Sequence, residues 1–221
     1  MNNITLPATI ILAGATKSGK SYFCKNTLMP LLKGQYTHLV ICSPNLNVNH
    51  DFDFVKDNDK NVFKVSNNIS TAVGEMIDSQ KKIFEMREMD LIKDKDIPRI
   101  LCILDDCIGE SILRGERSLM ARFGIQSRHY YMSFVIMTQR IAGLPRQLRI
   151  NAAYMIAFSV MNYTELERLV LEYCPKKFHK QFQKKLIDIY SVPFNFLFID
   201  NFERKIKDRI YVNGVERVEW E

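Results

Sequence analysis

Residues 9–21 read TIILAGATKSGKS, in which an apolar run leads directly into the octet at 14–21, GATKSGKS. The octet matches the phosphate-loop pattern G-x-x-x-x-G-K-[ST], which binds phosphate when a strand precedes it and a helix follows it. Its two glycines let the backbone curl so that successive N–H groups point at an anion, and the helix adds the positive end of its dipole. The stretch therefore predicts a site for a nucleoside triphosphate, with ATP and Mg²⁺ as the expected cofactors.

Two residues of the octet have individual roles in this interpretation. Lys20 is predicted to reach the β- and γ-phosphates and to take part in catalysis, and Ser21 is predicted to ligate Mg²⁺. The residues expected to contact the nucleotide are Gly14, Ala15, Thr16, Lys17, Ser18, Gly19, Lys20, Ser21 and Tyr22.

A second apolar run, ILCIL at 100–104, ends in Asp105 and Asp106. A buried strand that delivers acids at its carboxyl end is how phosphate-loop NTPases hold the second side of Mg²⁺. We expect Asp105 to be the carboxylate on the metal side and Asp106 to orient or deprotonate the attacking water. The alternative is two acids that merely end a strand.

A third run, MSFVIMT at 132–138, ends in Gln139. If this strand lies between the two strands already described, its terminal amide faces the same crevice and can sense the γ-phosphate. Gln139 is therefore a predicted catalytic residue, and a glutamine that opens an ordinary turn is the alternative.

Basic segments flank the third run, GIQSRH at 124–129 and LPRQLRIN at 144–151. A guanidinium inserted into the site of a neighbouring subunit would neutralise charge that develops on the transferred phosphoryl group. Arg128 is predicted to be this trans-acting finger, with Arg122 and Arg149 as alternatives. For any one of these arginines, a role as a surface residue or as a phosphate contact is the alternative.

The spacing of the apolar runs predicts an α/β protein with a mostly parallel central sheet flanked by helices. Residues 43–68, rich in Asn, Asp and Pro, are expected to be irregular apart from one short strand, and Ser70 is expected to cap the helix that follows. The predicted strands are 8–13, 37–42, 62–65, 100–104, 132–138, 154–158, 194–199 and 206–212. The predicted helices are 20–32, 70–91, about 115–125, 163–173 and an amphipathic helix around 176–186.

The composition is that of one domain spanning residues 1–221, because 47% of the residues are hydrophobic. Its five cysteines and four histidines show no metal-ligand spacing, which favours reduced thiols and an intracellular protein. We expect neither a membrane span nor an export signal. The net charge is +6, and residues 175–209 carry nine basic against four acidic residues, which permits a polyanionic partner.

The segments GATKSGKS, ILCILDDC, GIQSRHYYMSFVIMTQ and LPRQLRIN together resemble the FtsK/HerA superfamily of DNA pumps, and within it the poxvirus-type genome-packaging ATPases. The resemblance covers about residues 8–160, the expected ATPase core, and leaves 161–221 as a basic extension of helices and strands. It implies a RecA-like P-loop NTPase of the additional-strand type. Gln139 and Arg128 match the sensor and the intersubunit arginine, Arg149 and Asn151 match a downstream element, and Asp106 departs from the Glu of many relatives.

The resemblance also implies a function and partners. We expect an ATP-driven translocase that packages double-stranded viral DNA into a preformed capsid, acting as a homo-oligomeric ring, pentamer or hexamer, that docks on a capsid vertex protein. Such a protein would be found in the host cytoplasm, in a viral factory or with the virion. DNA would be gripped through its backbone without regard to sequence, either by the loop with Arg114 and Arg117 or by the basic helix at 176–185.

Three other functions remain open from the sequence. Nucleoside and nucleotide kinases use the same phosphate loop at a similar chain length, although no arginine-rich lid segment is visible here. Phage assembly ATPases of the same superfamily export single-stranded DNA. An ATP-gated assembly protein that hydrolyses ATP very slowly is the third alternative, and the aspartate at position 106 keeps it open.

Overall fold

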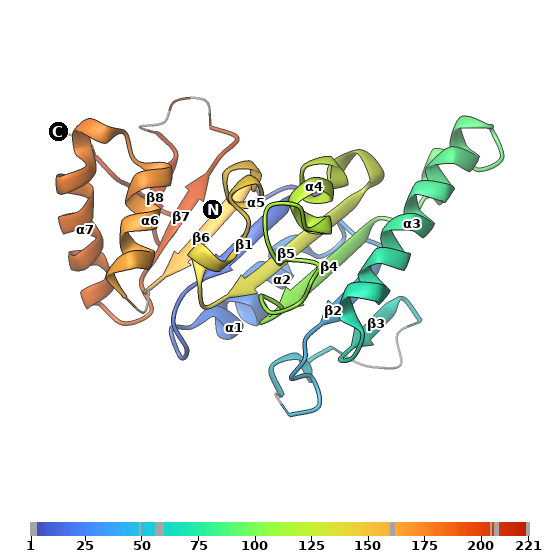
Figure 1. The fold of residues 1–221 in the computed structure, drawn as a ribbon, viewed down its shortest axis with the longest axis horizontal. Coiled ribbons are helices and arrows are strands. Elements are labelled where there is room, and N and C mark those ends of the chain that lie inside the picture. The colour runs from blue at the N-terminus through green and yellow to red at the C-terminus, as the bar shows by residue number, and fades with distance from the viewer. Residues whose placement is uncertain are drawn as a thin grey trace.

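The apolar run before the octet forms strand β1 (Thr9–Ala13), and all five of its residues are buried. The computed structural model describes residues 4–48, 50–55, 60–159, 162–203, 205 and 208–219. Within these residues the strands form one nine-stranded sheet in the order β3-β2-β4-β5-β1-β6-β7-β8-β9 (Figure 1). The other strands are β2 (His38–Cys42), β3 (Val62–Val65), β4 (Ile100–Asp105), β5 (Met132–Thr138), β6 (Tyr154–Phe158), β7 (Phe196–Asp200), β8 (Ile210–Val212) and β9 (Glu216–Arg217).

The sheet is parallel from β3 to β6 and antiparallel from β6 to β9. This confirms the predicted α/β class with a mostly parallel sheet. Strand β5 lies between β4 and β1, with Asp105 opposite Met137 and Ala13 opposite Thr138. The carboxyl ends of β4, β5 and β1 therefore meet at one edge of the sheet. This is the strand order that the prediction for Gln139 assumed.

Helices cover both faces of the sheet (Figure 1). One hydrophobic cluster joins the sheet to α3, α4, α5, α6 and α7, and a second joins the opposite face to α1 and α2. The helices are α1 (Lys20–Phe23), α2 (Met29–Leu32), α3 (Ile69–Glu88), α4 (Leu119–Gln126), α5 (Arg146–Asn151), α6 (Tyr163–Tyr173) and α7 (His179–Ser191). A π-helical turn, Cys24–Leu28, joins α1 to α2 and completes the predicted helix at 20–32.

Several helices and strands begin or end at residues other than those predicted. The expected cap Ser70 lies inside α3, because the helix begins at Ile69 after Asn68 in a left-handed conformation, and the Ser70 hydroxyl instead donates to Glu110. Helix α4 begins later than expected, where Ser118 accepts a hydrogen bond from the backbone N–H of Ala121. Of the predicted strand at 206–212, residues 206 and 207 lie outside the described residues, and the described part forms β8.

Two further features bear on the composition. The five cysteines are all buried and unpaired. In the part of the chain that the structure describes, no helix combines the length and the apolar character needed to cross a membrane.

Candidate active site

The octet forms a tight turn between β1 and α1. Gly14 has φ +155° and Gly19 has φ +104°, values that favour glycine. A Cβ atom at Gly14 would lie 2.7 Å from Cβ of Phe158 and 2.8 Å from Oγ of Ser18, so a side chain is also excluded by space. The Gly14 N–H donates to the carbonyl of Thr138, the last residue of β5, which ties the loop to the neighbouring strand.

Lys20 begins α1 and lies against the loop. Its ammonium group donates to the carbonyl oxygens of Gly14 and Ala15 at 2.7 and 2.8 Å. Burial lowers the pKa of Lys20, and the nearby charges of Asp105, Asp106 and Asp51 partly offset that effect. The lysine and the aspartates predicted for the site are therefore close enough to interact electrostatically.

Ser18 has a buried hydroxyl for which the described residues provide no hydrogen-bond partner. A buried polar atom without a partner costs about 1–3 kcal/mol, and such atoms often mark the place of a ligand or water. The loop therefore has one donor to spare for an anion, which fits the predicted phosphate site.

Asp105 ends β4 and accepts a hydrogen bond from the Ser43 hydroxyl at 3.2 Å. Burial raises the pKa of Asp105 to about 6. The bond from Ser43 opposes this shift, while the charges of Asp106 and Asp51 add to it. Asp106 follows with a left-handed backbone, φ +52°, and its N–H donates to the carbonyl of Met137 in β5.

Asp51 is a further acid at the site that the sequence did not single out. The Ser21 hydroxyl, predicted to ligate Mg²⁺, donates to the Asp51 carboxylate at 3.0 Å. Asp51 lies in the irregular segment after β2, where acidic residues are frequent and no periodicity distinguishes one from another. Ser43 offered a clearer signal, because it comes directly after a buried strand that ends at the same edge.

Gln139 reaches the phosphate loop. Its Oε1 atom accepts a hydrogen bond from the Thr16 hydroxyl at 3.0 Å. Gln139 follows β5, so the amide stands between the loop of β1 and the acids of β4. The structure thus brings the loop, the acids and the amide together at one edge of the sheet.

The donors at this edge suit the two expected cofactors. Mg²⁺ prefers oxygen ligands and is usually held by one or two carboxylates together with phosphate oxygens of the substrate. The Ser21 hydroxyl and the carboxylates of Asp51 and Asp105 provide oxygen atoms beside the phosphate loop. The residues present therefore fit both a triphosphate and Mg²⁺.

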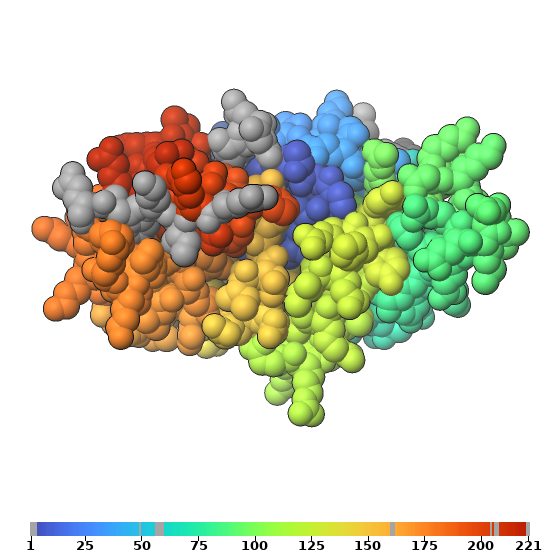
Figure 2. Space-filling model, turned by 90° about the horizontal axis from the view of Figure 1, so that it is seen from above, coloured from blue at the N-terminus to red at the C-terminus, as the bar shows by residue number. Residues whose placement is uncertain are grey.

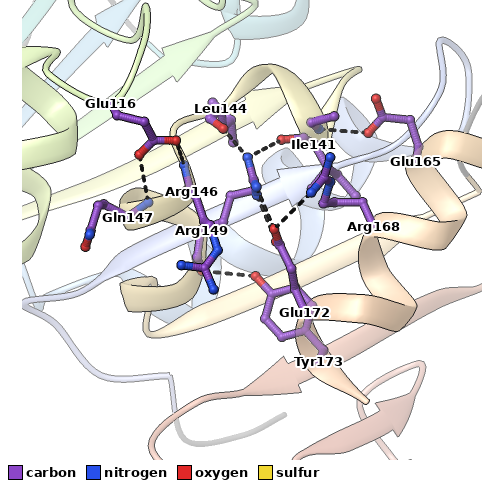
Figure 3. A network of polar contacts seen from close by, with 11 residues as sticks. Glu116, Ile141, Leu144, Arg146, Gln147, Arg149, Glu165, Arg168, Glu172 and Tyr173 are labelled. Atoms are coloured by element: carbon purple, nitrogen blue, oxygen red, sulfur yellow. Dashed lines mark hydrogen bonds and ion pairs between the residues drawn. The ribbon is translucent and has the colours of Figure 1, made fainter. Parts of the chain in front are cut away.

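Arg149, an alternative for the finger, is committed within its own chain (Figure 3). Its side chain is 4% exposed, and it bonds to both carboxylate oxygens of Glu172, at 2.8 and 2.5 Å. It also donates to the carbonyls of Ile141 and Leu144. Arg149 therefore anchors the segment after Gln139 to α6 and is not placed to enter another subunit.

Other members of the network in Figure 3 fix the same segment. Glu116 accepts from the backbone N–H groups of Arg146 and Gln147, at the start of α5. Glu165 in α6 accepts from the N–H of Ala142. The segment from 140 to 147 is thus attached to α6 on one side and to the loop after β4 on the other.

Arg128 lies in a 3₁₀ turn, Ser127–Tyr130, at the amino end of β5. It is exposed and lines a cavity of about 250 Å³ together with residues at the starts of β1 and β6, among them Thr9 and Ala153. The phosphate loop follows the other end of β1. Arg128 is therefore at the opposite edge of the sheet from the site of its own chain, and Arg122, on α4, is also exposed.

The loop between β4 and α4 protrudes from the molecule, and its lime colour identifies it in Figure 2. Arg114 and Arg117 in this loop are exposed. The loop starts immediately after Asp106 and is held at Glu116 by α5. A change at the acids of the site therefore has a short path to an exposed basic segment.

A search of curated proteins gave no match. Solved structures of known proteins do share this architecture. The genome-packaging NTPase B204 of Sulfolobus turreted icosahedral virus 2, solved with AMPPCP, is 18% identical with a TM-score of 0.62 over 93% of this chain and 96% of that one. The DNA-packaging ATPase B204 of Sulfolobus turreted icosahedral virus is 16% identical, with a TM-score of 0.66 over 93% of this chain and 96% of that one.

A third solved structure and a family model extend the comparison. The conjugation coupling protein TcpA of pCW3, solved with ATPγS, is 17% identical with a TM-score of 0.53, over 86% of this chain and 56% of that one. At these identities the similarity shows the fold. The family model described as "Poxvirus A32 protein" matches residues 3–199, which is most of the chain. The chain therefore belongs to the poxvirus A32 protein family, as its resemblance to the poxvirus-type ATPases had predicted.

Proposed function

We propose that this chain is an ATP-driven translocase that packages double-stranded viral DNA into a preformed capsid. The observation that carries the proposal is the meeting of the phosphate loop, Asp105 and Gln139 at one sheet edge, in a member of the poxvirus A32 family. The packaging enzymes among the similar structures support it. In this proposal residues 1–221 act as one ATPase unit, with 8–160 as its core.

The proposed chemistry assigns one task to each group. Lys20 and the loop N–H groups hold the phosphates, and Ser21 and Asp105 hold Mg²⁺, which when bound neutralises charge on the phosphates. Asp106 orients or deprotonates the attacking water, and Gln139 reports the γ-phosphate to the segment that follows it. Asp51 is an additional oxygen donor on the metal side, through its contact with Ser21.

Arg128 is the proposed finger, and its position supports a contact between subunits. An arginine at the amino edge of the sheet does not serve the site at the carboxyl edge of the same chain. One subunit must therefore present its amino edge to the carboxyl edge of the next, which is a head-to-tail contact, and such contacts form a ring when the rotation between subunits closes. The proposed ring has five or six subunits.

The proposed DNA contact is the protruding loop with Arg114 and Arg117, because it begins next to Asp106. The basic helix α7 is the rival contact. A capsid vertex protein is the proposed docking partner, and the host cytoplasm, a viral factory or the virion is the proposed location. Because phosphate contacts dominate such binding, affinity for DNA should fall steeply with salt.

The test is steady-state ATP hydrolysis measured over a range of protein concentrations, with and without duplex DNA. Activity should rise with both. Arg128→Ala should lower kcat by roughly 10³-fold or more while ATP still binds. Arg99→Ala, an exposed arginine beside the amino end of β4, is the matched control and should keep its activity.

Mixed assemblies test whether sites are shared between subunits. Arg128→Ala and Asp106→Ala should each be inactive alone. In an equimolar random ring, about a quarter of the interfaces pair an intact finger with an intact Asp106, so activity should return. Activity that is flat in DNA and in protein concentration would contradict the motor. Transfer of phosphate to a nucleoside would favour a kinase, and stimulation by single strands would favour an export ATPase.

A further inference from the structure

An aromatic cavity of about 450 Å³ adjoins the phosphate loop. Its lining residues are Gly19, Tyr22, Phe23, Thr27, Phe158, Phe194 and Phe196. Gly19 belongs to the loop and Tyr22 to α1, whereas Phe194 and Phe196 come from the C-terminal part of the chain. The cavity therefore shares Gly19 with the phosphate loop and uses a segment that the sequence analysis assigned to a basic extension.

Three of the phenylalanines form a packed floor. The ring centroids of Phe23 and Phe158 are 5.6 Å apart, those of Phe23 and Phe196 are 5.0 Å apart, and those of Phe158 and Phe196 are 5.2 Å apart. Such pairs are rigid and mutually stabilising. At the rim, Phe194 is 69% exposed and Tyr22 is 74% exposed. The cavity thus has a fixed apolar floor and two accessible aromatic rings above it.

Phe194 is held over the phosphate loop at the cost of backbone strain. It has φ +66°, which is unfavourable for a bulky side chain and tends to occur where a ligand is clamped. Its Cδ1 atom lies 3.2 Å from the position of a Cβ atom on Gly19. Hydrogen bonds from Asn195 to the carbonyls of Val192 and Ile189 fix the turn that presents the ring.

We propose that this cavity binds the nucleobase of the nucleoside triphosphate, with Phe194 stacking on the base. The proposal rests on the proposed function, because the phosphates of the same ligand occupy the loop. The volume falls within the roughly 300–1,000 Å³ of small-molecule sites. A flat aromatic ring above an apolar floor suits a planar base, and Gly19 connects the two halves of the site without an intervening side chain.

The lining also sets the base selectivity. Tyr22 and Thr27 contribute the side-chain hydroxyls of the cavity, and the other lining side chains are aromatic. A site rejects a related substrate strongly when its buried polar groups are built to pair with the correct one. Neither hydroxyl-bearing residue here is buried, because Tyr22 is exposed and Thr27 is half-buried. Stacking accepts every base, since each base has a π-face. The protein is therefore expected to bind ATP and GTP within about tenfold of each other.

The test compares ligands that have a base with one that has none. Dissociation constants for ATP, GTP and inorganic tripolyphosphate are measured by calorimetry with Mg²⁺ on the full chain. Phe194→Ala should weaken both nucleotides by roughly 5- to 150-fold, the range for loss of one stacked base, and leave tripolyphosphate within about twofold. Phe194→Trp should retain nucleotide binding. Phe63→Ala, an exposed phenylalanine on strand β3 at the sheet's edge, is the matched control and should change nothing.

The outcomes separate this inference from the proposed function. If ATP binds the unaltered protein but Phe194→Ala leaves its affinity unchanged, the base lies elsewhere while the phosphate site stands. A preference for ATP over GTP above about a hundredfold would also overturn the inference, because the base edge would then be read. If neither nucleotide nor tripolyphosphate binds the unaltered protein, both the cavity and the proposed function are wrong.

Discussion

Replacing Glu172 by leucine is expected to lower the free energy of unfolding by about 3–5 kcal/mol. The carboxylate is 6% exposed and pairs with Arg149, which is 4% exposed. In the variant, the Arg149 guanidinium keeps the carbonyls of Ile141 and Leu144 but loses its buried counter-charge. Arg168 lies 3.9 Å from the Glu172 carboxylate, so a second cation loses its partner as well.

The loss should be visible in both chemical and thermal unfolding. For a chain of this length each kcal/mol corresponds to about 2–4 °C, so Tm should fall by about 6–20 °C. Urea unfolding followed by circular dichroism gives the free energy, and the change should depend little on salt because the pair is buried. As a control, Arg146→Ala removes an exposed arginine from α5, the helix that carries Arg149. Its free energy of unfolding should stay within about 0.5 kcal/mol of that of the unaltered protein.

A double variant isolates the pair. Arg149→Met combined with Glu172→Leu removes both charges and should recover about 2 kcal/mol, leaving a loss of about 1–3 kcal/mol for the carbonyls that Arg149 had satisfied. A change below about 1 kcal/mol in the Glu172 variant, or no coupling in the cycle, would refute the reasoning. The folded double variant should also keep its ATPase activity. Complete loss of turnover would make Arg149 a candidate for the trans-acting finger again.

Three further changes test the local geometry. Gly14→Ala places a Cβ atom 2.7 Å from Phe158 and should weaken ATP binding at least tenfold in calorimetry, with a loss of about 1–3 kcal/mol in stability. Asp105→Asn should stabilise the nucleotide-free protein by up to about 3 kcal/mol, because folding raises the carboxyl pKa from 3.8 to about 6. That gain should grow from pH 4 to pH 6, stay constant above, and accompany loss of Mg²⁺-dependent hydrolysis. Ser118→Ala removes the cap of α4 and should cost about 1 kcal/mol in urea unfolding.

Much of the sheet was predictable because its parallel strands are buried on both faces and so appear as continuous apolar runs. The runs at 132–138 and 154–158 coincide with β5 and β6. Helix α6 also matched its predicted bounds, since Asn162 caps it and its apolar residues recur at helical spacing. Ser70 failed as a cap because the helix begins one residue earlier, at Ile69, and its hydroxyl accepts a hydrogen bond from the backbone N–H of Ile112, a distant partner that local rules do not include.

The site residues also fall into those that local patterns predict and those that depend on distant parts of the chain. The phosphate loop and Asp105 follow local patterns, so their neighbourhood could be inferred from strand order. The contacts of Asp51 and Ser43 depend on the path of an irregular segment, and Phe194 reaches Gly19 from a distant part of the chain. Arg149 matched a downstream family element, but its burial depends on Glu172 in another helix, which no spacing reveals.

The charges at the site also explain why acids surround a loop that is built for an anion. The carboxyl groups of Asp51, Asp105 and Asp106 all act on the ammonium group of Lys20, so acids outnumber this cation three to one. A bare triphosphate would be repelled by such a surplus, since like charges at close range disfavour each other. A divalent cation between the phosphates and the acids reverses the sign of the interaction. The hydroxyl of Ser21, which donates to Asp51, links the phosphate loop to these acids.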